Sequence, residues 1–176
     1  MKSIATSVLF ALFVLVMSQA DAQEMPSHVL ETLNRVVGKW TMERVVAGKK
    51  SSSVFELEWA IPETVLLFKW RGTDALTGHE SSSMGVLGWD PIKQLVVEHE
   101  IGSGGFTADC THIITPDGKW ISPGSGTAIL QGKPVHHQGH RIFTIVSNDE
   151  WTVTSVDSVV DGKLQAEDIS TLTRQK

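Results

Sequence analysis

The stretch Leu33-Asn34-Arg35-Val36-Val37-Gly38-Lys39-Trp40 marks a change of periodicity in this 176-residue chain. Before it, Ser27 is a typical helix N-cap, and apolar residues recur at helical spacing up to Val37. Gly38 can adopt the left-handed conformation that ends many helices. From Lys39 onward, apolar and polar residues alternate. We therefore expect a short helix to end here and a series of strands to begin.

Turn-forming residues recur about every twelve positions after this point, and short links of this kind join antiparallel neighbours. No helical pattern interrupts the series. The sequence therefore predicts an all-β fold, a single antiparallel up-and-down β-barrel of about ten strands preceded by a short N-terminal helix. Closure would remove the exposed edges of such a sheet. A two-sheet sandwich is the alternative. The predicted strands are 39–46, 52–60, 64–71, 82–89, 94–101, 105–114, 119–130, 137–146, 150–159 and 164–173.

The first 22 residues have the pattern of a secretory signal peptide. Lys2 precedes an apolar run from Val8 to Met17, and Ala20-Asp21-Ala22 forms a small-x-small cleavage site. This run is shorter than the about 20 residues that a membrane span needs, although a retained anchor is the alternative. We expect residues 1–22 to be removed and residues 23–176 to form one lipocalin-like barrel domain in the periplasm or outside the cell.

Charge and cysteine content exclude several classes of protein. The formal net charge of −5 gives nucleic acid no reason to bind, and residues 23–176 contain no stretch apolar enough to span a membrane. Cys110 is the single cysteine, so the chain forms no internal disulfide. We expect a buried, inert thiol, with a reactive thiol as the alternative. The oligomeric state is left open by the sequence.

Two features of the chain resemble the lipocalin superfamily: the Gly38-x-Trp40 motif after a short helix, and the regular meander. In lipocalins this tryptophan packs across the closed end of the barrel, often beside an arginine from the last strand. Arg174 occupies the matching position here. The resemblance implies a calycin-type barrel.

The chain is more similar to an uncharacterised family of bacterial exported proteins with a lipocalin-like domain. Members share the Gly-x-Trp motif, a second tryptophan, here Trp59, and a Gly-(Trp/Tyr)-Asp-Pro-like turn, here Gly88-Trp89-Asp90-Pro91. The resemblance covers most of residues 30–172 and implies a fold rather than an activity. The longer glycine-rich motif of a haem-binding branch is not reproduced around Trp40, so no haem ligand is carried over. No cofactor is expected.

A histidine cluster, His136, His137 and His140, is the weak candidate for a metal site. Side chains alternate along a strand, so His136 and His140 would face one way and His137 the other. Three ligands from one strand converge only at a bulge, which Gly139 could provide. A solvated loop or strand start is the alternative.

The second cluster is His99, Cys110 and His112. In 94–101, the set containing His99 is the more apolar, so we expect it to face the interior and to lie near Cys110 and His112 on the next strand. A Cys–His pair can form a thiolate nucleophile, but no third, orienting group is evident. Polar groups that orient a ligand explain the pattern better, and satisfied core or rim histidines are the leading interpretation. We add Asp157, as a buried carboxylate, and Trp70, as a pocket-lining ring, to the candidate ligand-binding residues.

The leading hypothesis is an exported barrel that binds a small, largely apolar molecule in its interior, with His99 and His112 orienting it. One alternative is a hydrolase or isomerase that uses an interior histidine or Asp157 as general base. Another is a packed interaction module. Gly124-Ser125-Gly126 lacks the nucleophile elbow of serine hydrolases, and no phosphate-binding loop is present. Whether the protein is an enzyme is left open.

Overall fold

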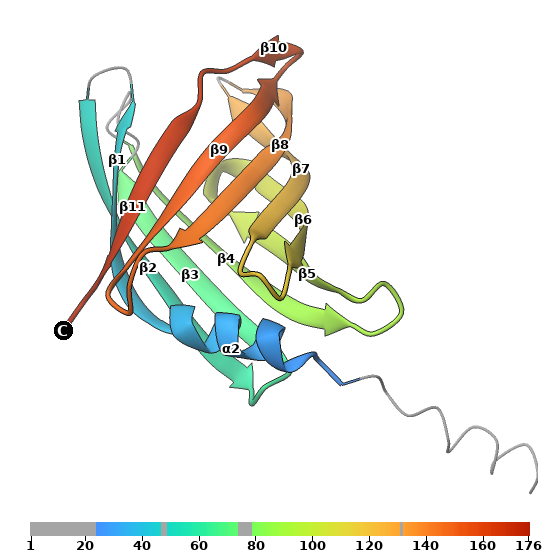
Figure 1. Cartoon of the computed structure of the whole chain (residues 1–176). Coiled ribbons are helices and arrows are strands. Elements are labelled where there is room, and N and C mark those ends of the chain that lie inside the picture. The colour runs from blue at the N-terminus through green and yellow to red at the C-terminus, as the bar shows by residue number, and fades with distance from the viewer. Residues whose placement is uncertain (1–23, 47–48, 74–78, 131) are drawn as a thin grey trace, which may run out of the picture.

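The structure is a computed structural model that describes residues 24–46, 49–73, 79–130 and 132–176. It is one antiparallel sheet whose strand order is β10-β9-β11-β1-β2-β3-β4-β5-β6-β7-β8, closed into a barrel by pairing of β8 with β9 (Figure 1). The strands are β1 (Gly38–Val46), β2 (Lys49–Ile61), β3 (Val65–Thr73), β4 (Glu80–Asp90), β5 (Leu95–Gly102), β6 (Phe106–Ile114), β7 (Trp120–Leu130), β8 (Lys133–Ile145), β9 (Glu150–Val160), β10 (Lys163–Leu164) and β11 (Asp168–Arg174).

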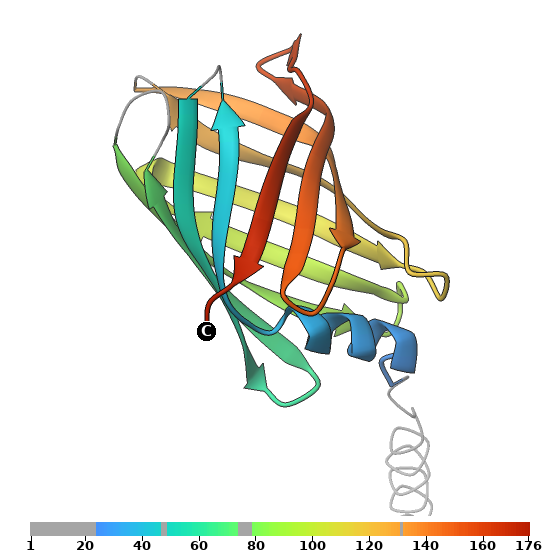
Figure 2. The same cartoon turned by 60° about the vertical axis from the view of Figure 1, so that its left-hand side comes forward.

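This architecture confirms the predicted ten-strand antiparallel barrel and rules out the sandwich. The two-residue strand β10 extends β9 as a small hairpin, and the other ten strands form the wall (Figure 2). Most strands pair with their neighbours in sequence, as expected of a meander joined by short turns. Strand β8 begins at Lys133, before the predicted start at 137, because Gly132 already makes the turn with a φ of 76°.

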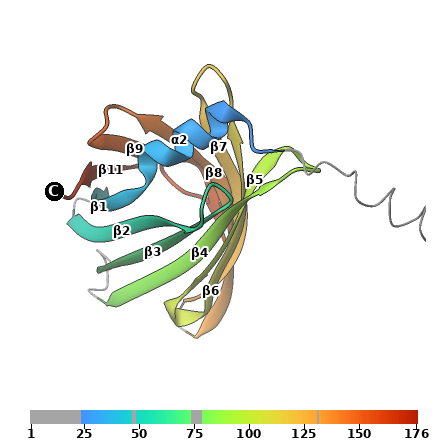
Figure 3. The ribbon, with the colours of Figure 1, turned by 90° about the horizontal axis from the view of Figure 1, so that it is seen from below.

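Helix α2 (Ser27–Val36) lies across one end of the barrel (Figure 3). It begins at Ser27 itself, one residue earlier than predicted, since Pro26 takes the N-cap position and makes no side-chain cap hydrogen bond. Its buried residues are Val29, Leu33 and Val36. The helix closes this end of the barrel, but its buried face is turned from the predicted one: of Leu30, Leu33 and Val37 only Leu33 is buried, and Val29 and Val36 join it.

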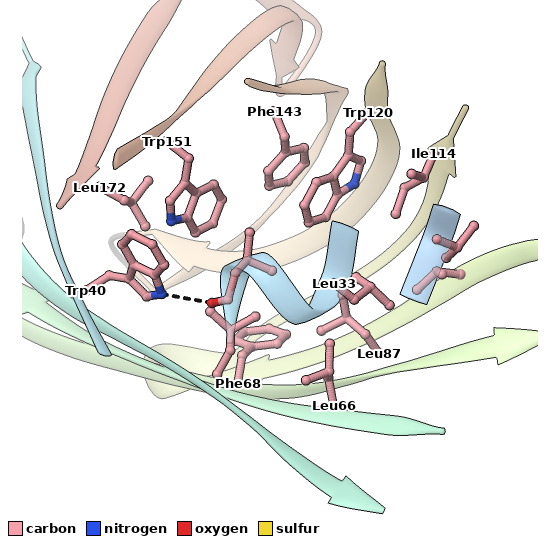
Figure 4. Packing of buried hydrophobic residues seen from close by; sticks show 14 residues of the cluster. Leu33, Trp40, Leu66, Phe68, Leu87, Ile114, Trp120, Phe143, Trp151 and Leu172 are labelled. Atoms are coloured by element: carbon pink, nitrogen blue, oxygen red, sulfur yellow. Dashed lines mark hydrogen bonds between the residues drawn. The ribbon is translucent and has the colours of Figure 1, made fainter. Parts of the chain in front are cut away.

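Tryptophan side chains fill the closed end beneath the helix. Trp40 is 1% exposed and donates from Nε1 to the carbonyl oxygen of Val36 at 2.8 Å (Figure 4). Its ring meets Trp151 edge to face, with centroids 5.7 Å apart, and Trp151 stacks in turn near Phe143 and Trp120. Burial of a large apolar side chain contributes about 1.5–3 kcal/mol, so this cluster stabilises the barrel strongly.

Arg174 ties the last strand to the end of the helix. Its guanidinium lies 4.1 Å from the centroid of the Trp40 ring and donates to the carbonyl oxygens of Val37 and Arg35, each at 2.8 Å. A cation there satisfies carbonyls that a helix end leaves unpaired. The backbone of Gly38, with a φ of 138°, leaves room for the arginine. The placement of Arg174 beside Trp40 confirms the lipocalin-like expectation.

The signal peptide predicted for residues 1–22 lies outside the described residues, so removal of these residues and export stay predictions. Within the described ranges, no helix is both long and apolar enough to cross a membrane.

Candidate functional site

The interior of the barrel is divided into an apolar end and a polar end. The cluster around Trp40 fills the end beneath α2, whereas a cavity of about 390 Å³ lies among residues nearer the opposite strand ends. Polar side chains from five strands line this cavity: Arg44, Glu100, Ser122, His137, Arg141, Ser155 and Ser158. Phe106, Ala108 and Val160 supply apolar parts of the wall. This cavity is the candidate functional site.

Small residues on adjacent strands make the recess. Ala108 on β6 pairs with Gly126 on β7, and Gly124 pairs with Gly139 on β8. A Cβ atom on Gly124 would collide with the Sγ atom of Cys110, which lies directly over it. No side chain projects from the wall at these glycines. The space in front of this part of the wall therefore stays open.

A hydrogen-bonded chain leads from the apolar end into the cavity. Trp120 Nε1 donates to His112 Nδ1 at 3.0 Å, and His112 Nε2 lies 2.8 Å from Glu98 Oε2. An indole N–H can only donate, so Nδ1 must accept, and His112 is the neutral tautomer that donates from Nε2 to Glu98. Arg141 Nη2 donates to Glu98 Oε1 at 2.8 Å and to Cys110 Sγ at 3.0 Å. The chain fixes the position of Arg141.

The charges in this chain are set by burial and by the partners. Burial alone would raise the pKa of Glu98, but the charge of Arg141 and the hydrogen bond from His112 outweigh it and lower that pKa to about 2. Burial lowers the pKa of His112, which keeps the ring neutral. Glu98 also raises the pKa of Arg141 against the effect of burial. The result is a charged Arg141–Glu98 pair that a neutral histidine supports.

Cys110 does not carry a nucleophile. Its side chain is buried, and burial raises the pKa of the thiol to about 11 although the charge of Arg141 opposes the shift. The nearby His112 cannot take its proton, because both ring nitrogens already have partners. The expectation of a buried, inert cysteine fits this geometry, and the reactive thiol does not.

His99 lies outside the barrel, and this corrects the predicted inward orientation. It pairs in register with Asp109, while Glu98 pairs with Cys110, so the interior set of β5 contains Glu98 and Glu100. The Nδ1 atom of His99 lies 2.5 Å from Asp109 Oδ1 on the exposed surface. The more apolar face of β5, which contains His99, was expected to point inward. The face that does point inward contains Glu98, whose buried charge is compensated by the ion pair with Arg141. Because apolarity alone decided the prediction, Glu98 was missed.

His112, Asp157 and Trp70, the other predicted ligand-binding residues, are dispersed. His112 faces inward as expected, but it is 2% exposed and is not among the residues that line the cavity. Asp157 is exposed, because a β-bulge opposite Gly139 gives it a φ of 50° and interrupts the alternation. The prediction of a buried carboxylate there was wrong. Trp70 faces the interior and donates to Ser53 Oγ at 3.0 Å, outside the cavity lining.

The histidine cluster separates as strand alternation predicts. His136 and His140 are exposed, whereas His137 is half-buried and lines the cavity. All three lie in β8, which begins at Lys133, so of the alternative of a solvated loop or strand start the loop is wrong. No group of three or more potential metal ligands assembles among the described residues. Burial and the charge of Arg141 lower the pKa of His137. His137 therefore belongs to the cavity as a neutral ring.

On the cavity lining, the buried Ser122 Oγ has no hydrogen-bond partner, whereas the ring of His137 interacts with the backbone of Thr107. Ser122 is 1% exposed. An unsatisfied buried donor or acceptor costs about 1–3 kcal/mol, so native structures rarely keep one without a compensating use. Sequence reasoning did not single out Ser122, since a serine between Ile121 and Pro123 carries no recognisable motif.

A larger depression of about 700 Å³ lies on the outer surface. Exposed polar side chains line it, including His99, Asp109, His140 and Asp157. Most of its polar groups are exposed, whereas the interior cavity also contains the buried Ser122 and the half-buried His137 and Arg141. The interior cavity is the better defined site.

No family model matches the chain, and no curated protein matches it. Among solved structures, it is similar to Rv2717c from M. tuberculosis, with a TM-score of 0.56 and 14% identity over 87% of this chain and 100% of that one. It is also similar to an S-type phycobiliprotein lyase, CPES, from Guillardia theta, with a TM-score of 0.48 and 17% identity over 90% and 98%. A de novo designed fluorescence-activating β-barrel is similar with a TM-score of 0.45 and 13% identity, over 82% of this chain and 97% of that one. At 14% identity, the likeness to Rv2717c shows a shared barrel fold alone.

Proposed function

We propose that this protein binds a small molecule inside the barrel, in the cavity that Arg141, Ser122 and His137 line. The observation that carries the proposal is the fixed, charged Arg141 on the lining of a cavity of about 390 Å³. That volume falls in the range of about 300–1,000 Å³ of small-molecule sites. A polar group of the ligand would bind the N–H donors that the hydrogen bonds of Arg141 to Glu98 and Cys110 leave unused.

The wall of the cavity is suited to binding because its central side chain is held in place. Arg141 is fixed by Glu98, which His112 and Trp120 hold in turn. A pre-positioned side chain loses little conformational entropy when a ligand arrives, so more of the interaction energy appears as affinity. The ligand-binding role is thus supported by residues that never touch the ligand.

The apolar part of the wall supports a ligand that is partly apolar. Phe106, Ala108 and Val160 lie on the same lining as the polar groups. Apolar surface buried against them would contribute about 25 cal/mol per Å². We therefore propose an amphiphilic ligand in place of the largely apolar one expected from sequence. If the predicted signal peptide directs export, the protein would bind it outside the cytoplasm.

The geometry favours this function over the two alternatives. A general base is not evident at the predicted positions, because His112 has both nitrogens engaged and Asp157 lies on the outer surface. A packed interaction module would have a filled interior, whereas this barrel keeps a cavity among buried polar groups. Binding without a defined reaction is the function that the described residues support best.

Native mass spectrometry of the protein purified from its own host tests the proposal. We expect a stoichiometric small molecule that leaves on denaturation. Ala108→Phe places a ring in the cavity and should abolish the passenger, whereas Thr107→Phe adds the same ring to the outer face of β6 and should keep it. Equal loading of both variants, or a wild type without any passenger, would contradict interior binding.

A further inference from the structure

We infer that the ligand is an anionic small molecule with a planar body, whose carboxylate, sulfonate or phosphate group meets Arg141 and Arg44 inside the barrel. This inference rests on the proposed interior site and specifies its ligand class.

The first argument is the position of the two arginines relative to their counter-ions. Arg141 and Arg44 both line the cavity, but their acidic partners, Glu98 and Asp168, do not. Glu98 is 4% exposed behind Arg141, and Asp168 lies 3.7 Å from Arg44 on the neighbouring strand. Arg141 therefore presents positive charge to the cavity with its acid buried behind it, whereas Arg44 lines the cavity beside Asp168, which shares the inward face of β11 with Ser170 and Leu172.

The second argument is the unused hydrogen-bonding capacity of Arg141. A guanidinium carries five N–H donors. The hydrogen bonds of Arg141 to described residues, to Glu98 and to Cys110, both leave from Nη2. A third of its side chain, 33%, is accessible on the cavity side. The remaining donors can bind one acceptor-rich group, which is the chemistry that arginine recognises best.

The third argument concerns Glu100, the one carboxylate among the described residues that line the cavity. Burial raises its pKa and the nearby Glu98 adds to the shift, against a hydrogen bond from Ser83 and the charge of Arg141. An ionised carboxylate at this position would repel an anion. Replacement of Glu100 by a neutral side chain of similar shape should therefore favour an anionic ligand.

A flat wall beside these donors fits a planar body. The rings of His137 and Phe106 stack with centroids 5.3 Å apart and an interplanar angle of 8°. Both line the cavity. A conjugated ring can lie against this pair while its anionic group meets Arg141.

The test compares two fluorescent probes that differ in one group. Anilinonaphthalene sulfonate is anionic and has a planar naphthalene body, and phenylnaphthylamine is its neutral analogue. We expect the sulfonate to bind the wild type at neutral pH at least about tenfold more tightly, since a hydrogen-bonded charge pair is worth that much. Ala108→Phe should abolish binding of both probes, and this locates them in the cavity.

Charge variants separate recognition from a structural role. Arg44→Gln and Arg141→Gln should each weaken sulfonate binding about tenfold and leave the neutral probe nearly unchanged. Glu100→Gln should tighten sulfonate binding about twofold or more, an increase that a structural defect would not produce. Arg71→Gln is the matched control, because Arg71 is exposed on β3, and it should change the affinity of neither probe. Circular dichroism checks that each variant folds. If Arg141→Gln does not fold, the probe affinities of Arg44→Gln and Glu100→Gln test the anionic ligand class.

The outcomes distinguish the two proposals. Preferential sulfonate binding that the three cavity variants shift as stated supports the anionic class. Equal affinity for both probes, with no change in Arg44→Gln or Glu100→Gln, overturns the anionic class and leaves interior binding intact. A lack of uptake of either probe, or uptake that Ala108→Phe does not reduce, counts against the interior site itself.

Discussion

Replacement of Glu98 by glutamine should destabilise the folded protein by about 3 kcal/mol at neutral pH. Glu98 is 4% exposed and accepts hydrogen bonds from His112 and Arg141. These partners lower its pKa from 4.5 to about 2. A difference of about 2.5 pKa units at 1.36 kcal/mol each gives about 3 kcal/mol. Loss of one member of a buried pair typically costs about 3–5 kcal/mol, in agreement.

The pH dependence has a defined sign. The pKa of Glu98 is lower in the folded state than in the unfolded state, so its contribution is complete above about pH 4.5 and disappears as the pH falls toward about 2. The wild type should lose this stability across that window, and Glu98→Gln should not. The difference between the two proteins should therefore shrink as the solution is acidified.

Urea unfolding followed by tryptophan fluorescence measures both effects. With a slope of about 2 kcal/mol per molar urea, the midpoint should fall by about 1.5 M in the variant. Glu58→Gln is the control, because Glu58 forms an exposed ion pair with Lys69 at 2.9 Å and should matter by less than about 1 kcal/mol. A midpoint for Glu98→Gln as high as that of the control, at neutral pH and below pH 3 alike, would refute the role assigned to this pair.

Three further outcomes are expected. Trp120→Phe keeps the aromatic stack but removes the donor to His112, and should lower the free energy of unfolding by about 1–2 kcal/mol; an unchanged urea midpoint would contradict the hydrogen-bonded chain. Arg174→Ala removes the donors to the carbonyls at the end of α2, and amide hydrogen exchange should rise in the helix before it rises in the strands; equal protection would argue against this link. Cys110 should resist thiol reagents at mildly alkaline pH in the folded protein and react once urea unfolds it; rapid labelling of the folded state would disprove a buried thiol of high pKa.

The parts of the fold predicted correctly are those encoded by local signals. The helical spacing that ends at Gly38, the alternation that begins at Trp40 and the recurrent turns were sufficient for a helix-capped meander. The position of Arg174 against Trp40 followed from the family resemblance. Residues that act through sequence neighbours are visible in the sequence itself.

The candidate site was only partly predictable because its residues depend on distant partners. The interior face of β5 was assigned by apolarity, which favours the set of His99 over Glu98, whereas the charge of Glu98 is compensated by Arg141 some forty positions away. The outward position of Asp157 depends on a bulge that no residue type announces. Cys110 and His112 were correctly placed inside because β6 alternates cleanly.

The most direct test of interior binding is to locate the bound anilinonaphthalene sulfonate by intermolecular nuclear Overhauser effects. Adjacent residues on one strand face opposite sides of the wall. We predict contacts from the probe to the methyl groups of Ala108 and Val160, which line the cavity, and none to Thr107 and Val159, which line the outer surface. Contacts to the outer pair without the inner pair would contradict the account and place the binding site on the outside of the barrel.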